Sequence, residues 1–364
     1  MKRMVYPLIL LLILMSCETE DNDTNNENTE ENTTELFDIV GYLELTDGPH
    51  DLAIKGSILY ACRNDQVQII DISDVTNPVL KTPYNDLENL NIFETMLISG
   101  NTLFLGCTQS SGIYALDITE PLDPSITGKF VDPIYGSTYF KPFKFFKANS
   151  ILWATGSNGS NAMLVKFNID NLNAITIDDY WTSNQTGNVG GGIWANSSNV
   201  FISTANGYIY SFNANDISSG PIDEYTFSNE AGHEHWGRKL EGAGNTLYWA
   251  DWGAGFVTID ITDPGNLKAT ALITNSSFKS QYAETEGTDV YDFAFNLTKT
   301  SIFVANGWSG LFLVNTSNPS VVNDYVDYPE NQYYCIEYYN NYVIVGDIVA
   351  GISDMKGIKI IKVE

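Results

Sequence analysis

The sequence predicts an all-β fold, a seven-bladed β-propeller, and three observations support this fold class. Nearly the same sequence motif of about 13 residues recurs along the chain. The copies are spaced as in propellers, and short apolar runs precede each copy. The clearest copies are QVQIIDISDVTNP at 66–78, GIYALDITEPLDP at 112–124 and GFVTIDITDPGNL at 255–267.

The repeat spacing gives the number of blades. Each unit has an Asp or Asn, or a final Lys, at the end of its third expected strand: Asp71, Asp117, Asn168, Asn213, Asp260, Asn315 and Lys362. Successive markers are 45 to 55 residues apart. A period of this size with several short strands indicates a propeller and not a helical solenoid. Seven units result, and six blades is the alternative count.

Each unit contains the strands of one blade. In the second unit, residues 93–100, 101–107, 112–118 and 125–130 are four expected strands. The inner runs are continuously apolar, as expected where neighbouring blades cover both faces. The Asp-Ile-Ser/Thr corner that follows the third strand is interpreted as structural, because a short side-chain acceptor ties down backbone N–H groups in a turn.

The two ends of the propeller segment predict how the ring closes. The last unit ends at its third strand, IKIIKVE at 358–364, while LFDIVGYLEL at 36–45 is a strand with no unit of its own. We expect residues 36–45 to supply the missing outer strand of the last blade, which removes the open sheet edges.

The repeated line resembles a known family. The pattern GxxxxDIxxPxxP at 112–124, and more loosely at 255–264, is similar to the LVIVD repeat of bacterial β-propeller proteins, whose biochemical role is mostly undefined. The resemblance covers residues 36–364 and is most distinct in units one, two and five. It implies a propeller scaffold and names no reaction.

The N-terminal residues indicate export. Residues 1–16 have a basic start, an apolar run at 7–15 and Ser16 before Cys17, which is typical of a signal peptide. LMSC at 14–17 resembles the lipobox of bacterial lipoproteins, which implies that Cys17 carries a lipid anchor. Residues 18–35 contain eight acidic side chains and no apolar ones, so we expect residues 17–35 to form a lipidated, disordered tether before the propeller at 36–364.

These features predict a location but leave its orientation open. We expect a protein held at the outer membrane by its lipid, with the propeller on the cell surface or on the periplasmic side. An ordinary secretory signal with a free cysteine is the alternative.

Composition excludes some classes of partner. The net charge of -27 repels polyanions, so nucleic acid is not expected as a ligand. No Gly-rich phosphate loop, serine-nucleophile elbow, HExxH or paired CxxC is present, and no cofactor is predicted.

The blade register predicts which residues line the upper mouth of the central channel. We define the upper face as the one with the loops that connect successive blades, where the long irregular segments gather. Counting back from the turn after each first strand gives His50 with its neighbour Asp51, Glu94, Phe143, Gly191, Arg238, Asp292 within one residue, and Tyr334. Such groups are able to bind a polar ligand or perform acid–base chemistry, or simply pair with one another and with channel water.

Two further groups of residues on the upper loops are candidates. Trp236, Trp252 and Trp308 lie beside Gly, Asp and Asn, a composition suited to stacking on sugar rings, although tryptophans also fill gaps between blades. His233 and His235 are two residues apart and form a weak candidate for a metal site, without an identifiable third ligand.

Three hypotheses of function follow. The first is a binding protein whose upper face engages a glycan or a protein. The second is a polysaccharide hydrolase or lyase that uses Glu94, Asp292, His50 and Arg238. The third is a scaffold subunit of an outer-membrane complex.

Overall fold

A computed structural model of the chain describes residues 37–46, 48–63, 66–85, 93–108, 112–131, 140–227, 234–282, 289–327, 331–347 and 356–363. All of them belong to the compact unit Leu36–Glu364. The expected signal peptide, Cys17 and the acidic tether lie outside the described residues, so these remain predictions. No helix in the described ranges is both long and apolar enough to cross a membrane.

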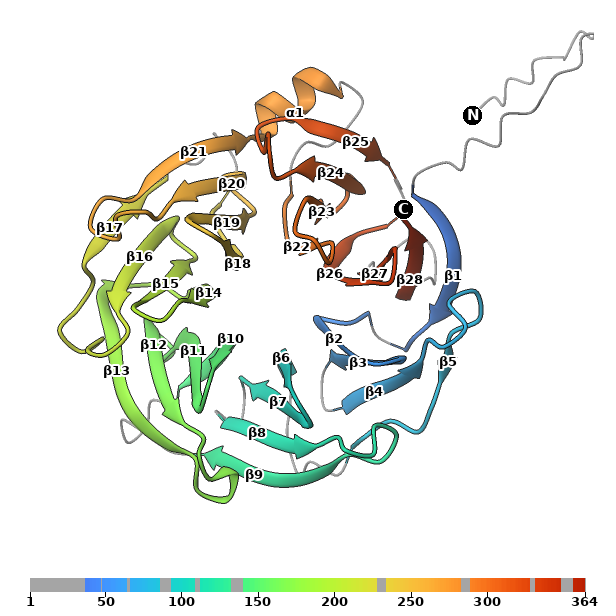
Figure 1. The fold of residues 1–364 in the computed structure, drawn as a ribbon, viewed down its shortest axis with the longest axis horizontal. Helices are drawn as coiled ribbons and strands as arrows, with labels where there is room; N and C mark the ends of the chain where they lie inside the picture. The colour runs from blue at the N-terminus through green and yellow to red at the C-terminus, as the bar shows by residue number, and fades with distance from the viewer. Residues whose placement is uncertain are drawn as a thin grey trace, which may run out of the picture. The chain divides into compact units, whose positions relative to one another are not determined.

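The described residues form seven four-stranded antiparallel sheets arranged as a ring (Figure 1). The seven-bladed propeller is therefore confirmed, and the six-bladed alternative is wrong. In each sheet the first strand of the unit lies nearest the central axis and the last lies at the rim (Figure 1).

The first four blades follow the chain order. Blade 1 has β2 (Asp51–Lys55), β3 (Ile58–Arg63), β4 (Gln66–Asp71) and β5 (Val79–Leu80). Blade 2 has β6 (Phe93–Ser99), β7 (Thr102–Cys107), β8 (Gly112–Asp117) and β9 (Ser125–Val131). Blade 3 has β10 (Lys141–Ala148), β11 (Ile151–Ser157), β12 (Asn161–Asn168), the 3-10 helix Leu172–Ala174 and β13 (Thr176–Thr186). Blade 4 has β14 (Gly190–Ala195), β15 (Asn199–Thr204), β16 (Tyr208–Asn213) and β17 (Asp223–Thr226).

The remaining blades complete the ring. Blade 5 has β18 (Gly237–Ala243), β19 (Thr246–Asp251), β20 (Gly255–Asp260) and β21 (Lys268–Ile273), followed by helix α1 (Asn275–Gln281). Blade 6 has β22 (Asp292–Phe295), β23 (Ser301–Ala305), β24 (Leu311–Asn315) and β25 (Val322–Val326). Blade 7 has β26 (Tyr333–Tyr339), β27 (Tyr342–Asp347), β28 (Gly357–Lys362) and, from the N-terminal side, β1 (Asp38–Glu44).

The ring closes as the sequence predicts. Strand β1 pairs antiparallel with β28, with Asp38 opposite Lys362 and Glu44 opposite Gly357. The last blade therefore combines residues from the two ends of the propeller segment, and the outer edge of β28 is covered.

The hydrophobic core lies between neighbouring blades. Tyr60 and Val67 of blade 1 pack in one cluster with Leu103 and Leu105 of blade 2. The middle strands are buried along their length, whereas an outer strand such as β21 is largely exposed. Because each middle strand is covered on both faces, its sequence is continuously apolar and not alternating.

The repeated corner residues have the structural role that the sequence indicates. The side chains of six markers accept a hydrogen bond from the backbone N–H two residues later: Asp71, Asp117, Asn168, Asn213, Asp260 and Asn315. Hydrogen bonds from Ser73, together with Lys81, lower the pKa of Asp71 to about 2. Asn replaces Asp in three units because an amide oxygen accepts the same bond.

One upper-face segment that the sequence analysis treats as irregular contains a helix. The side chain of Thr274 caps α1 by accepting a hydrogen bond from Ser277 N, and the Ser277 side chain accepts one from Thr274 N. Phe278 is 1% exposed and packs against blade 6. A capping box and one buried ring therefore stabilise a helix of two turns that the propeller repeat does not predict.

Candidate functional site

The residues at the upper channel mouth are placed there by β-bulges. In blades 2, 3, 5 and 7 the pairing of the first two strands skips one residue, and the skipped residues are Glu94, Phe143, Arg238 and Tyr334. In blade 1, His50 donates its N–H to Cys62, which also lies opposite Asp51. A bulge leaves an extra residue unpaired and turns its side chain out of the regular pleat.

In the sixth blade the mouth residue is one position before Asp292, within the one-residue margin of the sequence prediction. Tyr291 donates its N–H to Ala305, which also lies opposite Asp292, so Tyr291 occupies the position of the extra residue. The register therefore places Tyr291 at the mouth, and Asp292 lies one residue along the strand.

Arg238 lies at the centre of an aromatic cluster that spans the channel. Its guanidinium carbon is 3.9 Å from the ring centre of Tyr334 in blade 7, 5.4 Å from Tyr291 and 5.6 Å from Phe143 in blade 3. The ring of Trp236 is 6.0 Å away. Since blades 3 and 7 are not neighbours of blade 5 in the ring, the contacts of Arg238 with Phe143 and Tyr334 are made across the channel.

The guanidinium of Arg238 makes no hydrogen bond or ion pair within the described part of the chain, although the residue is only 8% exposed. Burial lowers its pKa to about 10, with negative charges nearby opposing that effect, so the group is cationic at neutral pH. The surrounding rings supply cation–π attraction, which offsets part of the cost of burying the charge.

His50 and Glu94 form the second polar group at the mouth. His50 Nδ1 lies 3.2 Å from Glu94 Oε2, and both side chains are 20% exposed. The His50 ring is 5.3 Å from that of Tyr334, which connects this pair to the arginine cluster.

Asp51 and Asp292 lie below the mouth and connect blades. Asp51 accepts hydrogen bonds from Met96 N and from Thr95, at 2.8 and 3.0 Å, and pairs with Lys144 at 3.1 Å. Asp292 accepts from Ile336 N and pairs with Lys239, both at 3.1 Å. Both carboxylates are buried and saturated by neighbouring blades, which is a structural role.

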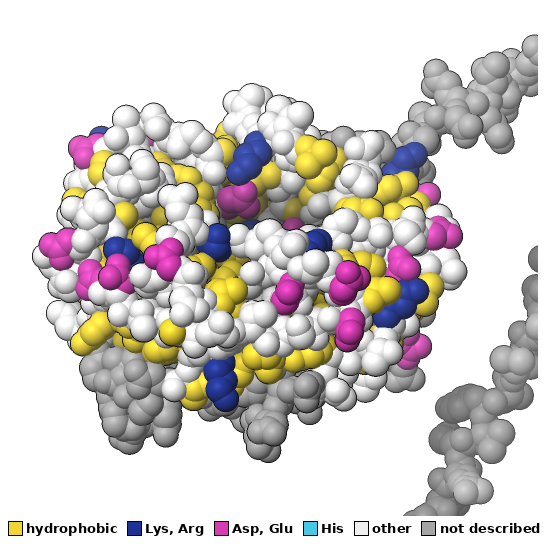
Figure 2. Space-filling view, turned by 60° about the horizontal axis from the view of Figure 1, so that its bottom comes forward, with side chains coloured by type: hydrophobic (Ala, Val, Ile, Leu, Met, Phe, Trp, Pro, Cys, Tyr) yellow, Lys and Arg dark blue, Asp and Glu magenta, His cyan; other side chains and the backbone are white. Residues whose placement is uncertain are grey.

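A cavity of 480 Å³ continues down the channel beneath these residues. The mouth residues His50, Glu94, Arg238, Tyr291 and Tyr334 do not line it, which indicates that they separate the cavity from the upper face. On the opposite side the cavity reaches the ion pair of Lys299 with Glu241, whose side chains are 46% and 29% exposed. Figure 2 shows a face of the ring with a central hollow bordered by acidic and basic side chains.

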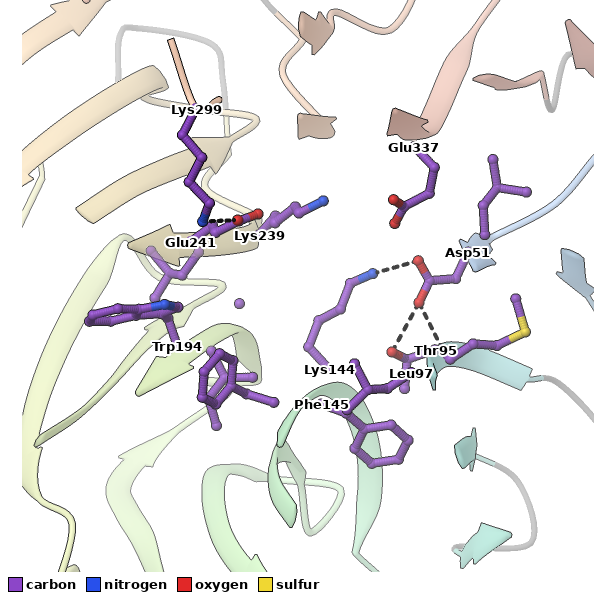
Figure 3. A pocket seen from close by; sticks show the side chains of 16 residues that line it. Asp51, Thr95, Leu97, Lys144, Phe145, Trp194, Lys239, Glu241, Lys299 and Glu337 are labelled. Atoms are coloured by element: carbon purple, nitrogen blue, oxygen red, sulfur yellow. Dashed lines mark hydrogen bonds and ion pairs between the residues drawn. The ribbon is translucent and has the colours of Figure 1, made fainter. Parts of the chain in front are cut away.

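Glu337 of β26 points into this cavity (Figure 3). Unlike Asp51 and Asp292, it makes no hydrogen bond or ion pair with any described residue. Burial raises its pKa to about 7, although Lys239 acts in the opposite direction. For Lys239 and Lys144 burial alone would lower the pKa, but the carboxylates around them outweigh it, so both pKa values are raised.

The remaining candidate aromatic residues separate into two groups. Trp252 donates its indole N–H to Asp289 at 2.6 Å and stacks on Tyr291, so it supports the mouth cluster from outside. Trp236 is 37% exposed and lies 6.2 Å from Phe143. Trp308 is 39% exposed and makes none of the ring contacts that join the described mouth residues.

Of the two histidines of the HEH segment, only His235 belongs to the described residues, so the candidate metal site stays a prediction. His233 lies outside those residues. His235 Nδ1 is 2.7 Å from Asp251 Oδ1, and its ring stacks on Trp249. Among the described residues, no three His, Cys, Asp or Glu side chains are grouped as metal ligands would be.

The sequence prediction for blade 6, Asp292 within one residue, includes Tyr291. The charged lining of the cavity is not predicted by the repeat, namely Lys144, Lys239, Glu241, Lys299 and Glu337. A signal existed for three of them. Lys144, Lys239 and Glu337 are charged residues in the middle of the first strands of their blades, KPFKFFKA, GRKLEGA and YYCIEYY. A charge at such a position indicates a channel-facing side chain, because the space between two blades does not accommodate an unpaired charge.

Comparison with known proteins agrees with the repeat pattern. The LVIVD repeat model matches residues 49–86 and 241–270, which lie in the first and fifth units. No curated protein sequence matches the chain significantly.

Solved structures share the fold at very low sequence identity. The Myceliophteria thermophila Cps50 (Swd1) β-propeller domain has a TM-score of 0.65 at 12% identity, covering 90% of this chain and 100% of that one. The computationally designed Ika8 protein has a TM-score of 0.58 at 10% identity, covering 90% and 99%. Chaetomium thermophilum Raptor has a TM-score of 0.64 at 7% identity, covering 90% of this chain and 29% of Raptor.

Identities this low establish the architecture alone. Together with the strand topology and the repeat match, they lead to one conclusion. The protein is a seven-bladed β-propeller that carries LVIVD repeats, an architecture consistent with an interaction module.

Proposed function

We propose that the propeller is a binding module that holds a carboxylate of an acidic glycan at the upper channel mouth. The observation that carries this proposal is Arg238, a buried guanidinium with no hydrogen bond or ion pair among the described residues. A guanidinium has five N–H donors in a planar fork that matches a carboxylate. A bidentate carboxylate would satisfy donors that the protein itself leaves unused. The net charge of -27 opposes the approach of an acidic glycan, but salt screens this repulsion beyond about 10 Å, whereas the contact with Arg238 acts at hydrogen-bond distance.

The surroundings of Arg238 suit a sugar. Trp236 and Phe143 offer ring faces beside the guanidinium, and Trp236 is exposed enough to be reached from solvent. The His50–Glu94 pair adds hydrogen-bonding groups for hydroxyls at the same mouth. An apolar ring surface next to a few fixed polar groups is the usual composition of a small-ligand site.

We also propose that the protein is located at the outer membrane. A lipid on Cys17 and a tether over residues 17–35 would hold the propeller at the outer membrane, where acidic polysaccharides are accessible. The signal-like start of the sequence and the lipobox resemblance support this location.

The direct test is the affinity of the purified protein for trigalacturonate, measured by isothermal titration calorimetry, with neutral maltotriose as the comparison ligand. We expect trigalacturonate to bind and Arg238→Gln to weaken its binding roughly 30-fold or more, because a charge-assisted bidentate pair contributes about 2 kcal/mol or more. Arg238→Lys retains the charge but not the fork, so we expect an intermediate loss, roughly tenfold.

Two tryptophans of nearly equal exposure provide a matched control. Trp236→Ala should weaken trigalacturonate binding, whereas Trp308→Ala should leave it unchanged, because only Trp236 contacts the arginine cluster. Equal affinity for trigalacturonate and maltotriose, or no binding of either, would contradict the proposal. In the second case the scaffold hypothesis is tested next, by identifying proteins that co-purify from membranes.

A lyase is the second candidate function, favoured by the His50–Glu94 pair, which contacts Tyr334, the same ring that Arg238 contacts. In this reaction Arg238 would neutralise the uronate carboxylate while the pair removes the proton from the adjacent carbon. The bond from the next carbon to the glycosidic oxygen then breaks, a carbon–carbon double bond forms, and the leaving oxygen takes up a proton. The conjugated double bond absorbs in the ultraviolet, so incubation with polygalacturonate tests it. Turnover that survives combined His50→Ala and Glu94→Gln would exclude this assignment.

A further inference from the structure

The cavity beneath the mouth is lined by a carboxyl group, Glu337, that takes no part in the proposed upper site. Lys144 and Lys239 line the deep end of the cavity, and each ammonium group lies 3.1 Å from an aspartate, Asp51 and Asp292 respectively. Each ammonium group therefore has a carboxylate partner. Glu337 is the remaining carboxyl group, and within the described part of the chain it has no ion-pair partner.

The walls of the cavity are apolar and aromatic. Leu97, Phe146, Ile193 and Trp194 line it between the charged end and the lower face. Trp194 and Phe146 are in edge contact, with ring centres 6.3 Å apart. In Figure 3 Trp194 lies on one side of the cavity and Glu337 on the other. The side chains of Lys144 and Lys239 lie between them in this view.

The described charged pair at the lower opening has no net charge. Lys299 is neutralised there by Glu241 at 2.9 Å. The protein as a whole carries a net charge of -27, which raises the local concentration of cations and lowers that of anions. The ionised carboxylate of Glu337 would repel an anionic ligand, whereas a cationic ligand would form the ion pair that Glu337 lacks among the described residues.

We propose that this cavity is a second ligand site, entered from the lower face, which binds a small organic cation through an ammonium group paired with Glu337 and an apolar body against Trp194 and Phe146. A volume of 480 Å³ lies within the range of small-molecule sites. The aromatic wall adds cation–π and dispersion attraction to the ion pair. The site is separate from the mouth, since none of the arginine cluster lines it.

The experiment compares benzylammonium with its neutral isostere benzyl alcohol, by calorimetric titration of the full protein at pH 8. We expect benzylammonium to bind roughly tenfold or more tightly, because only the cation pairs with the carboxylate. Glu337→Gln keeps the shape and removes the charge, so the two compounds should then bind equally. Glu120→Gln, an exposed glutamate on the lower face, is the matched control and should change nothing.

Two further variants test whether a change in benzylammonium affinity comes from the cavity and not from misfolding or from the upper site. Lys299→Gln removes the cation at the entrance and should raise benzylammonium affinity about twofold or more. Arg238→Gln should leave it unchanged, so failure here is distinguishable from failure of the glycan site. Equal binding of amine and alcohol to the wild-type protein, no binding of either, or an unchanged preference in Glu337→Gln would overturn the proposal.

Discussion

At the scale of single residues, the carboxylates in the channel differ in whether they have hydrogen-bond and ion-pair partners. Asp51 and Asp292 each accept backbone N–H groups and pair with a lysine. Glu337 is two methylene groups from its backbone and reaches the cavity without such partners. The low dielectric that strengthens the aspartate pairs also disfavours the ionised form of Glu337.

Glu337 therefore makes stability depend on pH in a defined direction. Its pKa rises from the usual 4.5 to about 7 on folding. Between these values the unfolded chain loses a proton that the folded protein retains, so the contribution of this group is present at low pH and lost as pH rises through about 7. We expect Glu337→Gln to raise the free energy of unfolding by about 1–3 kcal/mol at pH 8.

The same variant should have little effect at pH 4.5, where Glu337 is protonated in the folded protein. Denaturant unfolding of wild type and variant at both pH values measures the difference. A variant that is equally stabilised at pH 4.5 and pH 8 would show that packing, and not ionisation, is responsible.

At the scale of elements, the closing strand is held in place by close backbone packing. A Cβ at Gly41 would overlap the carbonyl oxygen of Val75 in the corner of blade 1. Strand β1 therefore completes blade 7 and at the same time packs against blade 1, and Gly41 allows this approach.

Gly41→Ala tests this contact. We expect it to lower the free energy of unfolding by about 1–3 kcal/mol, because the strand must shift away from the corner. Gly265→Ala is a control, since its Cβ would have no neighbour nearer than 3.4 Å, and it should change stability by less than about 0.5 kcal/mol. Thermal unfolding compares the two, and equal stability of both variants would contradict the packing argument.

At the scale of the whole molecule, every blade has two neighbours only because the ring is closed. Ile344 and Ile358 of blade 7 share one buried cluster with Leu52 and Leu59 of blade 1. Residues far apart in the sequence thus form one continuous core, and we expect a single cooperative unfolding transition.

Removal of β1 tests closure. A chain that begins at residue 46 lacks β1, whereas a chain that begins at residue 36 retains β1 and lacks only the expected signal peptide and tether. We expect the first to unfold at a temperature lower by at least several degrees and to self-associate through the uncovered edge of β28. The second should unfold like the full chain. Calorimetry and size-exclusion chromatography measure both, and identical behaviour of the two chains would mean that β1 does not stabilise the ring.

The sequence predicts the parts of this fold that local interactions and the repeat define. In blades 1 to 6 the corner contains an Asp or Asn whose side chain accepts a hydrogen bond from the backbone N–H two residues later, as Asp117 does from Thr119. A short sequence motif is enough to predict this contact. The same repeat gives the number of blades and the closing strand. It does not predict α1, because the Thr274–Ser277 cap lies outside the repeated pattern.

The sequence by itself determined the seven-bladed ring, its closure and the approximate register of the mouth. Only the tertiary structure decided which polar groups are paired. Arg238 meets Tyr334 across the channel, Lys144 reaches Asp51 from two blades away, and Glu337 remains without a partner among the described residues. These outcomes depend on bulges that shift a strand by one residue and on the distance across the ring. Repeat spacing fixes neither, because both arise from the packing of blades that are distant in the chain.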